Sequence, residues 1–272
     1  MFITNNLEIA KILDTCGVER VWIDLETLGK EERQGHLDSV KSHHCLDDIK
    51  KIKPHLKKSK LQVRVNPINP NSKEEIETVI KNGADYVMLP MFQTALEVQF
   101  FIDCVQGRSK TILLVETNGA VDNLEEILKI KGIDEIHIGL NDLHLCYKKT
   151  FMFELLTDGT VEKIINIIKK YNLPYGFGGV SKLGTGTLSA EYILGEHIRL
   201  GSSRVILSRS FCNTKLQSLE EIAEVFPKEY VKLIQFENNL LKQPKDYFDS
   251  NKQIVALKVK DIVSEMRDKN GN

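Results

Sequence analysis

Two short apolar segments most constrain how this chain can fold. Residues 111–115 form an apolar run that leads to Glu116, and residues 135–140 form a second run that leads to Asp142. Short runs of this kind are typical of strands in a parallel sheet that is covered on both faces. The intervening residues 121–131 carry apolar side chains at helical spacing. The order strand, helix, strand therefore predicts that the two carboxylates lie side by side at the carboxyl ends of neighbouring parallel strands.

Strand-like and helix-like segments alternate along most of the 272-residue chain without a break in composition. This length is long for one ordinary domain but normal for one α/β barrel. About eight such repeats predict a (β/α)8 TIM barrel with extra C-terminal helices. The expected strands are residues 2–4, 18–25, 61–67, 86–90, 111–116, 135–140, 174–180 and 203–207.

The connecting segments are less uniform than the strands. Residues 72–81 are expected to be a helix that begins with a capping box, because Ser72 and Glu75 have the Ser-x-x-Glu spacing in which two side chains satisfy the first backbone N–H groups. Residues 143–158 are expected to be irregular. Residues 31–45 form a long polar connection, and long connections inside compact domains tend to be functional.

The C-terminal part exceeds what a barrel needs. We assign residues 1–214 to a TIM-barrel catalytic domain and residues 215–272 to a helical extension. The barrel's own helices already cover its strands, so an apolar stripe on the extension predicts contact with another subunit; the alternative is that the stripe folds back onto its own barrel. The stripe comprises Leu219, Ile222, Val225, Phe226, Tyr230, Leu233, Ile234 and Leu240.

Bulk properties exclude several classes of partner. The formal net charge of −1 predicts no basic face for nucleic acid. No apolar run is long enough to span a bilayer, and the first residues lack the basic and apolar regions of a signal peptide. The five cysteines are scattered, odd in number and form no C-x-x-C pair, which favours reduced thiols in a cytoplasmic protein.

The two strand-end carboxylates suggest a metal site. Active sites of (β/α)8 barrels are built at the carboxyl ends of the strands. Glu116 and Asp142, with no Cys or His to complete a softer ligand set, suit a hard divalent cation such as Mg2+ or Mn2+. The alternative is that Glu116 caps the next helix and Asp142 begins a turn.

Five segments in order resemble one protein family. They are Asp24-Leu-Glu26 with Arg33, Val63-Arg64-Val65-Asn66, Leu89-Pro90-Met91, Glu116-Thr117, and Ile138-Gly139 with Asp142-Leu143. These motifs resemble the HpcH/HpaI aldolase and citrate lyase β-subunit family. The resemblance implies a barrel, a divalent cation on Glu116 and Asp142, and an enolate-type intermediate of a 2-oxo acid. It also implies that the terminal helices pack across a subunit boundary, and hence a homo-oligomer.

The sequence departs from the aldolase branch of that family near the expected site. The aldolase branch has a His directly after the strand-end Glu, where this chain has Thr27. A Gln that usually stands two residues before the metal-binding Glu is replaced by Leu114. The connection that carries Arg33, His36, His43 and His44 has no close counterpart in that branch. These differences leave the general base and the substrate open, but not the metal.

Four residues are candidates for catalysis. Arg64, at a strand end, is expected to donate to a developing enolate oxygen, or to form an ion pair with Asp24 or Glu26. His43 and His44 are candidate bases, because histidine titrates near neutral pH. Glu26 is expected to orient a metal-bound water, or to pair with Arg33. The expected strand ends carry no lysine, which disfavours a Schiff-base aldolase.

A glycine-rich strand end is a candidate substrate site. Gly178 and Gly179 would let backbone approach an anionic group, at a place where barrels often hold phosphate. Asn141 and Ser208 are assigned to substrate binding with them. The alternative is that the glycines allow tight packing of helix against strand.

These features lead to one reading and two alternatives. The first reading is a divalent-metal-dependent carbon–carbon lyase that cleaves or forms a 2-oxo acid aldol. The second is a citrate lyase-like enzyme acting on a CoA thioester, favoured by Asp24-Leu-Glu26 but without a recognisable basic groove for CoA phosphates. The third is a non-catalytic barrel that binds a small acid or sugar. The expected partners are a small 2-oxo acid or its aldol and other copies of the chain.

Overall fold

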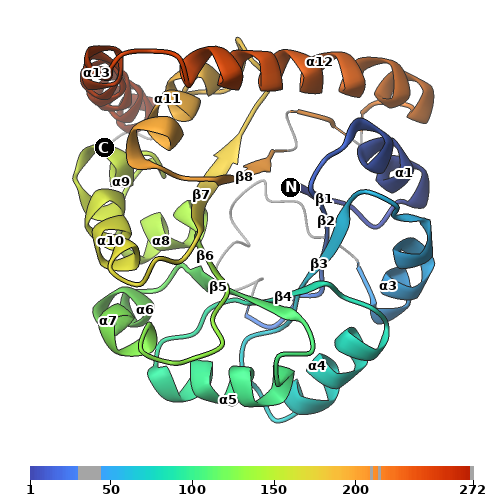
Figure 1. Cartoon of the computed structure of the whole chain (residues 1–272). Coiled ribbons are helices and arrows are strands. Elements are labelled where there is room, and N and C mark those ends of the chain that lie inside the picture. The colour runs from blue at the N-terminus through green and yellow to red at the C-terminus, as the bar shows by residue number, and fades with distance from the viewer. Residues whose placement is uncertain (30–43, 209–210, 214–215, 270–272) are drawn as a thin grey trace. The chain divides into compact units, whose positions relative to one another are not determined.

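The computed structural model describes residues 1–29, 44–208, 211–213 and 216–269. Its eight strands form one sheet in the order β1 to β8 (Figure 1). The pairs β1–β2, β2–β3, β3–β4, β4–β5 and β7–β8 are all parallel. This sequential parallel order confirms the expected (β/α)8 TIM-barrel class with C-terminal helices.

The strands lie close to the segments expected from the sequence. They are β1 (Phe2–Ile3), β2 (Arg20–Asp24), β3 (Lys60–Arg64), β4 (Tyr86–Leu89), β5 (Lys110–Val115), β6 (Glu135–Ile138), β7 (Tyr175–Val180) and β8 (Arg204–Leu207). Almost every strand residue from β2 to β6 is buried, as expected for a sheet covered on both faces. The chain forms two compact units, Met1–His137 and Ile138–Asn272.

Helices in the first unit lie outside its strands (Figure 1). Successive helices α1, α3, α4 and α5 contact one another in order. The helices of this unit are α1 (Leu7–Cys16), α3 (Leu46–Ile52), the 3-10 helix η1 (Lys53–His55), α4 (Ser72–Lys81), α5 (Ala95–Val105), α6 (Asn118–Asp122) and α7 (Leu124–Ile127).

The start of α4 differs from the expected capping box. Asn71 is the N-cap residue, and it makes no side-chain capping bond. The Ser72 hydroxyl instead accepts the backbone N–H of Asn69 at 2.9 Å. Glu75 turns away from the helix start, and its Oε1 accepts a bond from Nδ2 of Asn66 at 2.8 Å. The capping-box prediction was wrong because the helix begins one residue earlier than expected, which makes Ser72 its first residue, and because Asn66 takes the Glu75 carboxylate.

Two connections also differ from expectation. The segment 121–131 is not one helix, because α6 and α7 are separated at Asn123, whose side chain donates to the carbonyl of Gln93 at 2.9 Å. The segment 143–158, expected to be irregular, contains most of α8 (Leu140–Cys146) and all of α9 (Glu154–Thr157).

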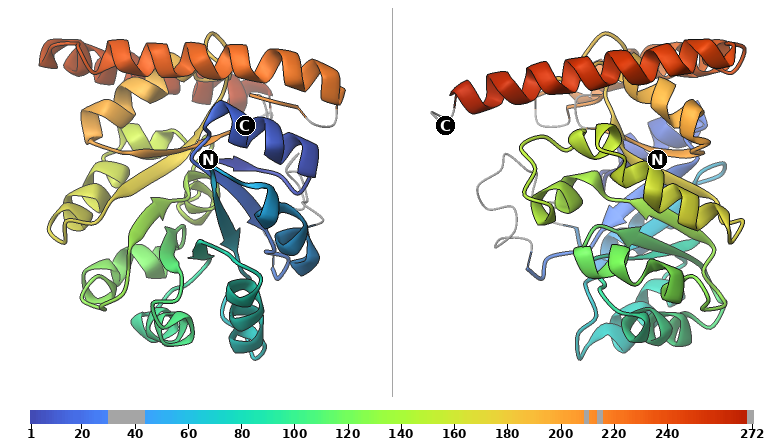
Figure 2. Two further views of the ribbon diagram at one scale, coloured as in Figure 1. Left: turned by 45° about the vertical axis from the view of Figure 1, so that its right-hand side comes forward. Right: turned by 90° about the vertical axis from the view of Figure 1, so that its left-hand side faces the viewer.

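The second unit holds the C-terminal helices, which are long (Figure 2). Its helices are α8, α9, α10 (Thr160–Lys169), α11 (Ala190–Leu200), α12 (Leu219–Leu240) and α13 (Lys245–Lys269). Helix α13 packs along α11 and α9. Asn251 of α13 anchors this contact by donating to the carbonyl of Tyr192 at 3.1 Å and to Oε1 of Glu196 at 3.0 Å. No helix among the described residues is long and apolar enough to cross a membrane.

The apolar stripe of the extension is largely covered in a single chain. Ile222, Phe226, Leu233 and Leu240 of α12 are each at most 4% exposed. Phe226 packs edge-on against Phe211, with ring centroids 5.2 Å apart. These four side chains therefore do not require a second subunit to bury them, whereas Leu219 of the same stripe is 39% exposed. The homo-oligomer stays a prediction. The predicted domain boundary near residue 215 stays a prediction.

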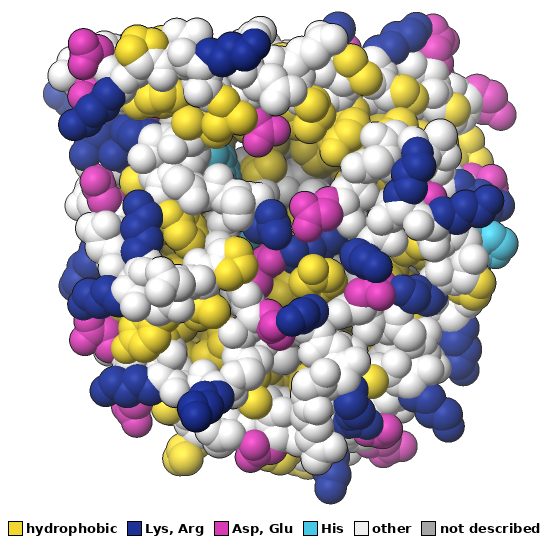
Figure 3. All heavy atoms as spheres, viewed as in Figure 1, with side chains coloured by type: hydrophobic (Ala, Val, Ile, Leu, Met, Phe, Trp, Pro, Cys, Tyr) yellow, Lys and Arg dark blue, Asp and Glu magenta, His cyan; other side chains and the backbone are white. Residues whose placement is uncertain are grey.

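Charged side chains of both signs share the surface. Figure 3 shows Lys and Arg side chains interspersed with Asp and Glu side chains over one face of the molecule. This mixture agrees with the formal net charge of −1.

A buried carboxylate in α1 fixes the turn that leads into β3. Oδ1 of Asp14 accepts the backbone N–H groups of Lys57, Lys58 and Ser59 at 3.0, 2.7 and 2.7 Å. Burial alone would raise the pKa of Asp14, but the bonds from Ser59, Lys58 and Lys57 outweigh burial and hold the pKa below its ordinary value. The charged form of Asp14 is therefore the form that stabilises the fold.

We expect Asp14→Ala to lower the free energy of unfolding by about 1–3 kcal/mol at neutral pH, since one buried and two partly buried N–H donors lose their acceptor. The folded pKa is depressed, so this contribution is present above about pH 4, near the unfolded pKa, and is lost as the pH falls through the folded value. Urea unfolding should be measured from pH 7 downward. The difference in the free energy of unfolding between wild type and Asp14→Ala should become smaller in acid. Glu8→Ala, at an exposed site of the same helix, is the control. A difference that is constant with pH would contradict the assignment.

Candidate active site

The carboxyl ends of β2 and β3 bring three charged side chains together. Asp24 ends β2, Arg64 ends β3, and the two residues are opposite each other in the parallel register. The guanidinium donates from Nε to Asp24 Oδ1 at 2.8 Å and from Nη2 to Asp24 Oδ2 at 2.9 Å. Its Nη1 lies 3.1 Å from Oε2 of Glu26. The ion pair considered for Arg64 is thus present, and it involves both carboxylates.

These three side chains are nearly excluded from solvent, at 11% exposed for Arg64 and 2% for each carboxylate. Burial alone would lower the pKa of Arg64, but the charges of Asp24, Glu26 and Glu116 raise that pKa above its ordinary value. The guanidinium therefore stays protonated. It also lies over the ring of Trp22, with Cζ 5.4 Å from the ring centroid, which adds a cation–π contact.

Glu116 follows β5 directly and is 2% exposed. Its Oε1 accepts the backbone N–H of Met91 at 3.2 Å. Met91 has a φ of 54°, in the left-handed region that non-glycine residues seldom adopt, and this conformation aims its N–H at the carboxylate. The alternative in which Glu116 caps the next helix is not observed, because Thr117 is the N-cap residue of α6 and its hydroxyl accepts the N–H of Ala120 at 2.9 Å.

The charge of this cluster suits a cation. Three buried carboxylates lie around one guanidinium, and carboxylate oxygens are the ligands that hard divalent cations take. In residues 1–29, 44–208, 211–213 and 216–269, no three or more His, Cys, Asp or Glu side chains are grouped to hold a metal ion. A cation here would therefore take few protein carboxylates and complete its shell with water or substrate oxygens, as Mg2+ commonly does.

Asp142 lies in the second unit. It is not at the end of β6, as the sequence suggested, but in the first turn of α8, which begins two residues after the strand ends. A carboxylate is stabilised there by the helix dipole. Asp142 is 6% exposed, so it is buried as a metal ligand would be. Glu116 belongs to the first unit, and the pairing of these two carboxylates on one cation stays a prediction.

Of the two histidines proposed as bases, the structure describes only His44. His43, together with Arg33 and His36, lies outside the described residues. Nδ1 of His44 accepts the backbone N–H of Asp24 at 2.9 Å. The neutral ring must then carry its hydrogen on Nε2. In this arrangement Nε2 of His44 is a donor, and the ring takes up a proton only by releasing the Asp24 N–H.

Sequence reasoning missed a polar bridge beside the cluster. Oδ1 of Asn66, two residues beyond Arg64, accepts the backbone N–H groups of Thr27 and Leu28 at 2.9 and 3.1 Å. The opposite end of the Asn66 amide donates to Glu75. The one available signal was a polar residue between a strand end and Pro67, and such a residue is equally typical of an ordinary turn.

The glycines of β7 allow close packing. A Cβ on Gly178 would lie 2.8 Å from Cδ1 of Leu140, and a Cβ on Gly176 would lie 2.3 Å from the carbonyl oxygen of Arg204. This supports the packing alternative for Gly178. Roles for Gly178, Gly179, Asn141 and Ser208 in substrate binding stay predictions.

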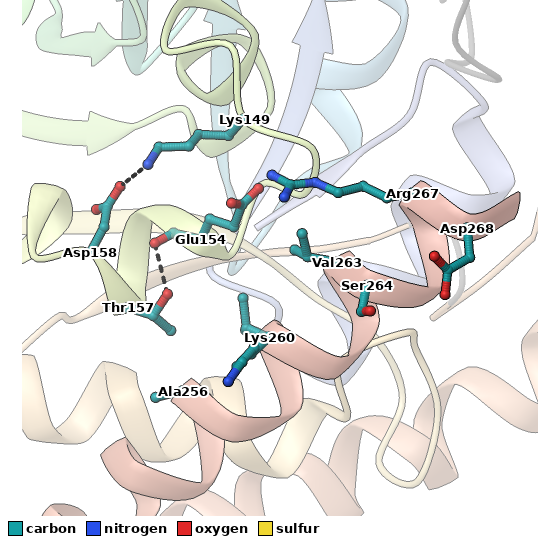
Figure 4. A pocket seen from close by; sticks show the side chains of 11 residues that line it. Lys149, Glu154, Thr157, Asp158, Ala256, Lys260, Val263, Ser264, Arg267 and Asp268 are labelled. Carbon is teal, nitrogen blue, oxygen red and sulfur yellow. Dashed lines mark hydrogen bonds and ion pairs between the residues drawn. The ribbon is translucent and has the colours of Figure 1, made fainter. Parts of the chain in front are cut away.

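A cavity of about 530 Å³ in the second unit lies between the α8–α9 region and α13 (Figure 4). It contains none of the predicted site residues. Its three basic lining side chains, Lys149, Lys260 and Arg267, are balanced by Glu154, Asp158 and Asp268. Lys149 is already paired with Asp158 at 2.7 Å. The lining therefore selects no class of charged ligand.

Comparison with known proteins bears on the family. The sequence model of the HpcH/HpaI aldolase/citrate lyase family matches residues 1–152. Comparison with curated protein sequences gives no significant match.

Solved structures with a similar fold include members of the same family. An HpcH/HpaI aldolase from Desulfitobacterium hafniense DCB-2 has a TM-score of 0.59 at 14% identity, covering 89% of this chain and 92% of that chain. A family protein from Burkholderia cenocepacia J2315 has a TM-score of 0.60 at 13% identity, covering 76% and 87%. A citrate lyase from Burkholderia xenovorans LB400 has a TM-score of 0.57 at 10% identity, covering 95% and 90%. At these identities the structures establish a shared fold alone. The family match spans more than half of the sequence, and the chain therefore belongs to the HpcH/HpaI aldolase/citrate lyase family.

Proposed function

We propose that the protein is a divalent-metal-dependent carbon–carbon lyase that cleaves or forms a 2-oxo acid aldol through a pyruvate-like enolate. The observation that carries this proposal is the buried cluster of Asp24, Glu26 and Glu116 around the permanently charged Arg64. Its carboxylate oxygens suit a hard cation, and its fixed guanidinium favours an anionic oxygen of the substrate. Mg2+ and Mn2+ are the cations that suit such oxygen ligands.

Arg64 is the donor for the developing charge. Two of its five N–H groups donate to Asp24, and Nη1 forms an ion pair with Glu26. A guanidinium with five N–H groups can then offer others to a substrate oxygen. The two bonds from Asp24 fix the plane of the guanidinium before substrate binds. A donor that is oriented in advance needs no reorganisation when negative charge appears in the transition state.

The reaction also needs a base and a Lewis acid. Cleavage begins when a base removes the proton from the aldol hydroxyl. The carbon–carbon bond then breaks, the aldehyde leaves, and the electrons of the broken bond form the enolate. Protonation of the enolate gives the 2-oxo acid. A divalent cation held by Glu116 and Asp142 would supply Lewis-acid stabilisation of negative charge. We assign the base to His43 or His44, with the Nδ1 contact of His44 favouring His43. Glu26, held by Arg64, is suited to orient water at the site.

The acidic strand end Asp24-Leu-Glu26 favours a second candidate, a citrate lyase-like enzyme that acts on a CoA thioester. A third is a non-catalytic barrel that binds a small acid or sugar. An assay for 2-oxo acid release from a panel of aldols and CoA thioesters, with Mg2+ or Mn2+ and with a chelator, separates all three. Release from free aldols only, abolished by the chelator, supports the first proposal.

Glu116→Gln and Asp142→Asn should each weaken Mg2+ or Mn2+ binding beyond detection and abolish lyase activity, because each removes a charged oxygen ligand without changing side-chain size. Calorimetric titration of the folded proteins measures the affinity. Glu126→Gln, at an exposed site on α7, is the control. Unchanged affinity in both variants would disprove the metal assignment.

Arg64→Lys should lower kcat by about 10²-fold or more, the scale of losing one donor to a developing oxyanion. Lysine keeps the charge but loses the planar fork that engages Asp24 and Glu26. Steady-state kinetics measures the effect, and Arg108→Lys at a surface ion pair is the matched control. Wild-type turnover in Arg64→Lys would remove Arg64 from the mechanism.

We also propose a homo-oligomer in a reducing, cytoplasmic compartment. The five cysteines are scattered along the sequence, odd in number and without a C-x-x-C pair, which supports the compartment. On α13, Tyr247, Ile254 and Leu257 are 38%, 39% and 64% exposed and follow one another at helical spacing, which supports contact with a second copy.

Replacing Ile254 and Leu257 together by Glu should dissociate the oligomer without unfolding it, because charge replaces exposed apolar surface. Light scattering at micromolar concentration gives the mass. Gln253→Glu adds a charge to an exposed neighbouring position of α13 and should leave the mass unchanged. A monomeric wild-type protein would end this proposal, and an oligomer that survives the double change would place the interface elsewhere.

A further inference from the structure

The segment that carries Glu26 is held on both sides by hydrogen bonds from its backbone. Before Glu26, the N–H of Leu25 donates to the carbonyl of Arg64 at 2.9 Å, extending the pairing of β2 with β3. After it, the N–H groups of Thr27 and Leu28 both donate to Oδ1 of Asn66. The Thr27 hydroxyl adds a third, longer bond to the same oxygen at 3.3 Å. The N–H of Glu26 itself donates to Oδ1 of Asp24 at 3.3 Å. The backbone that follows Glu26 is therefore the part that depends on where the Asn66 amide points.

Glu75 determines the orientation of that amide. Its Oε1 accepts Nδ2 of Asn66 at 2.8 Å, and both carboxylate oxygens lie 3.3 Å from the Asn66 backbone nitrogen. With Nδ2 committed to a carboxylate, Oδ1 must face Thr27 and Leu28, because a reversed amide would place oxygen against oxygen. Glu75 is the fourth residue of α4, and its carboxylate bonds to Asn66 outside the helix.

We infer that Asn66 is a positioning residue that holds Glu26 and Arg64 in their working geometry, and that Glu75 orients it. The role in catalysis rests on the proposed lyase function, whereas the role in geometry does not. Asn66 lies two residues after Arg64. Its Oδ1 accepts the backbone N–H groups of the two residues that directly follow Glu26. One amide thereby couples the ends of two neighbouring strands to α4.

The test exchanges the charges of the pair. Asn66→Asp keeps an acceptor for Thr27 and Leu28 but loses the donor to Glu75 and sets two carboxylates against each other. Adding Glu75→Gln to that variant restores a donor–acceptor pair in the opposite sense, since the Gln amide donates to the new carboxylate. The single variant should therefore lose the geometry held by the Asn66–Glu75 pair, and the double variant should recover it.

The expected loss of kcat in Asn66→Asp is about 10- to 100-fold, the usual scale for groups that orient catalytic side chains. KM should change much less, because Asn66 is argued to act through Glu26 and Arg64. The double variant should recover most of the kcat. Asn71→Asp, which adds the same charge at an exposed site at the start of α4, is the control.

A second readout is independent of activity. Trp22 is the chain's one tryptophan, and the guanidinium of Arg64 lies over its ring. Displacement of Arg64 should shift the emission of Trp22 in Asn66→Asp, and the double variant should return it to the wild-type spectrum. If the wild-type protein proves to have no lyase activity, the emission still decides the geometric role.

Two results would overturn the inference. One is wild-type kcat and wild-type emission in Asn66→Asp. The other is a double variant that is as impaired as the single one at an equal melting temperature. Should Asn66→Asp fail to fold, Asn66→Ala, which introduces no charge, replaces it in the comparison of emission and kcat. Unaltered emission and kcat in that variant count against the inference in the same way.

Discussion

The site depends on one pairing, the parallel register that sets Asp24 opposite Arg64 at the ends of β2 and β3. Because side chains alternate along a strand, a shift of one residue would send either side chain to the opposite face of the sheet and separate the fork from its carboxylate. The same register brings Trp22 beneath the guanidinium. Burial then makes the arrangement self-consistent, since an unpaired charge at so little exposure would be strongly destabilising.

The strands could be predicted because their signal is local. Buried runs such as 111–115 need no knowledge of their neighbours, and consecutive strands in parallel order follow from the alternation with helices. The helix starts were less predictable where a side chain had two possible partners. Ser72 and Glu75 have capping-box spacing, but the helix takes Asn71 as its N-cap residue, and Glu75 bonds to Asn66, nine residues before it. Likewise, the break at Asn123 depends on a carbonyl 30 residues away.

The candidate site divides in the same way. Arg64, Asp24, Glu26 and Glu116 could be named from the sequence because charged residues at strand ends are conspicuous. Their mutual geometry could not be predicted. The sequence indicated an ion pair of Arg64 with Asp24 or Glu26, and in the structure Arg64 contacts both carboxylates. The supporting residues Asn66 and Met91 were missed because amides and backbone N–H groups carry no distinctive pattern. Their roles arise from contacts with residues 9 to 39 positions away in the chain.

At the opposite end of the strands, Arg20 of β2 is joined to Glu135 of β6 by two bonds of 2.7 and 2.6 Å, with both side chains at most 3% exposed. The partners are separated by 115 positions in the chain. During synthesis, β2 therefore leaves the ribosome long before Glu135 exists, and the neighbouring Glu19, which is 54% exposed and lies 3.3 Å from Nη2 of Arg20, is the carboxylate at hand. Until β6 emerges, the guanidinium lacks its two buried bonds to Glu135, and water must remain near it to solvate it. Water can therefore leave the surroundings of Arg20 only after β6 has formed and Glu135 has paired with Arg20. Assembly of the first unit is thus cooperative, and it is slow compared with folding through local contacts.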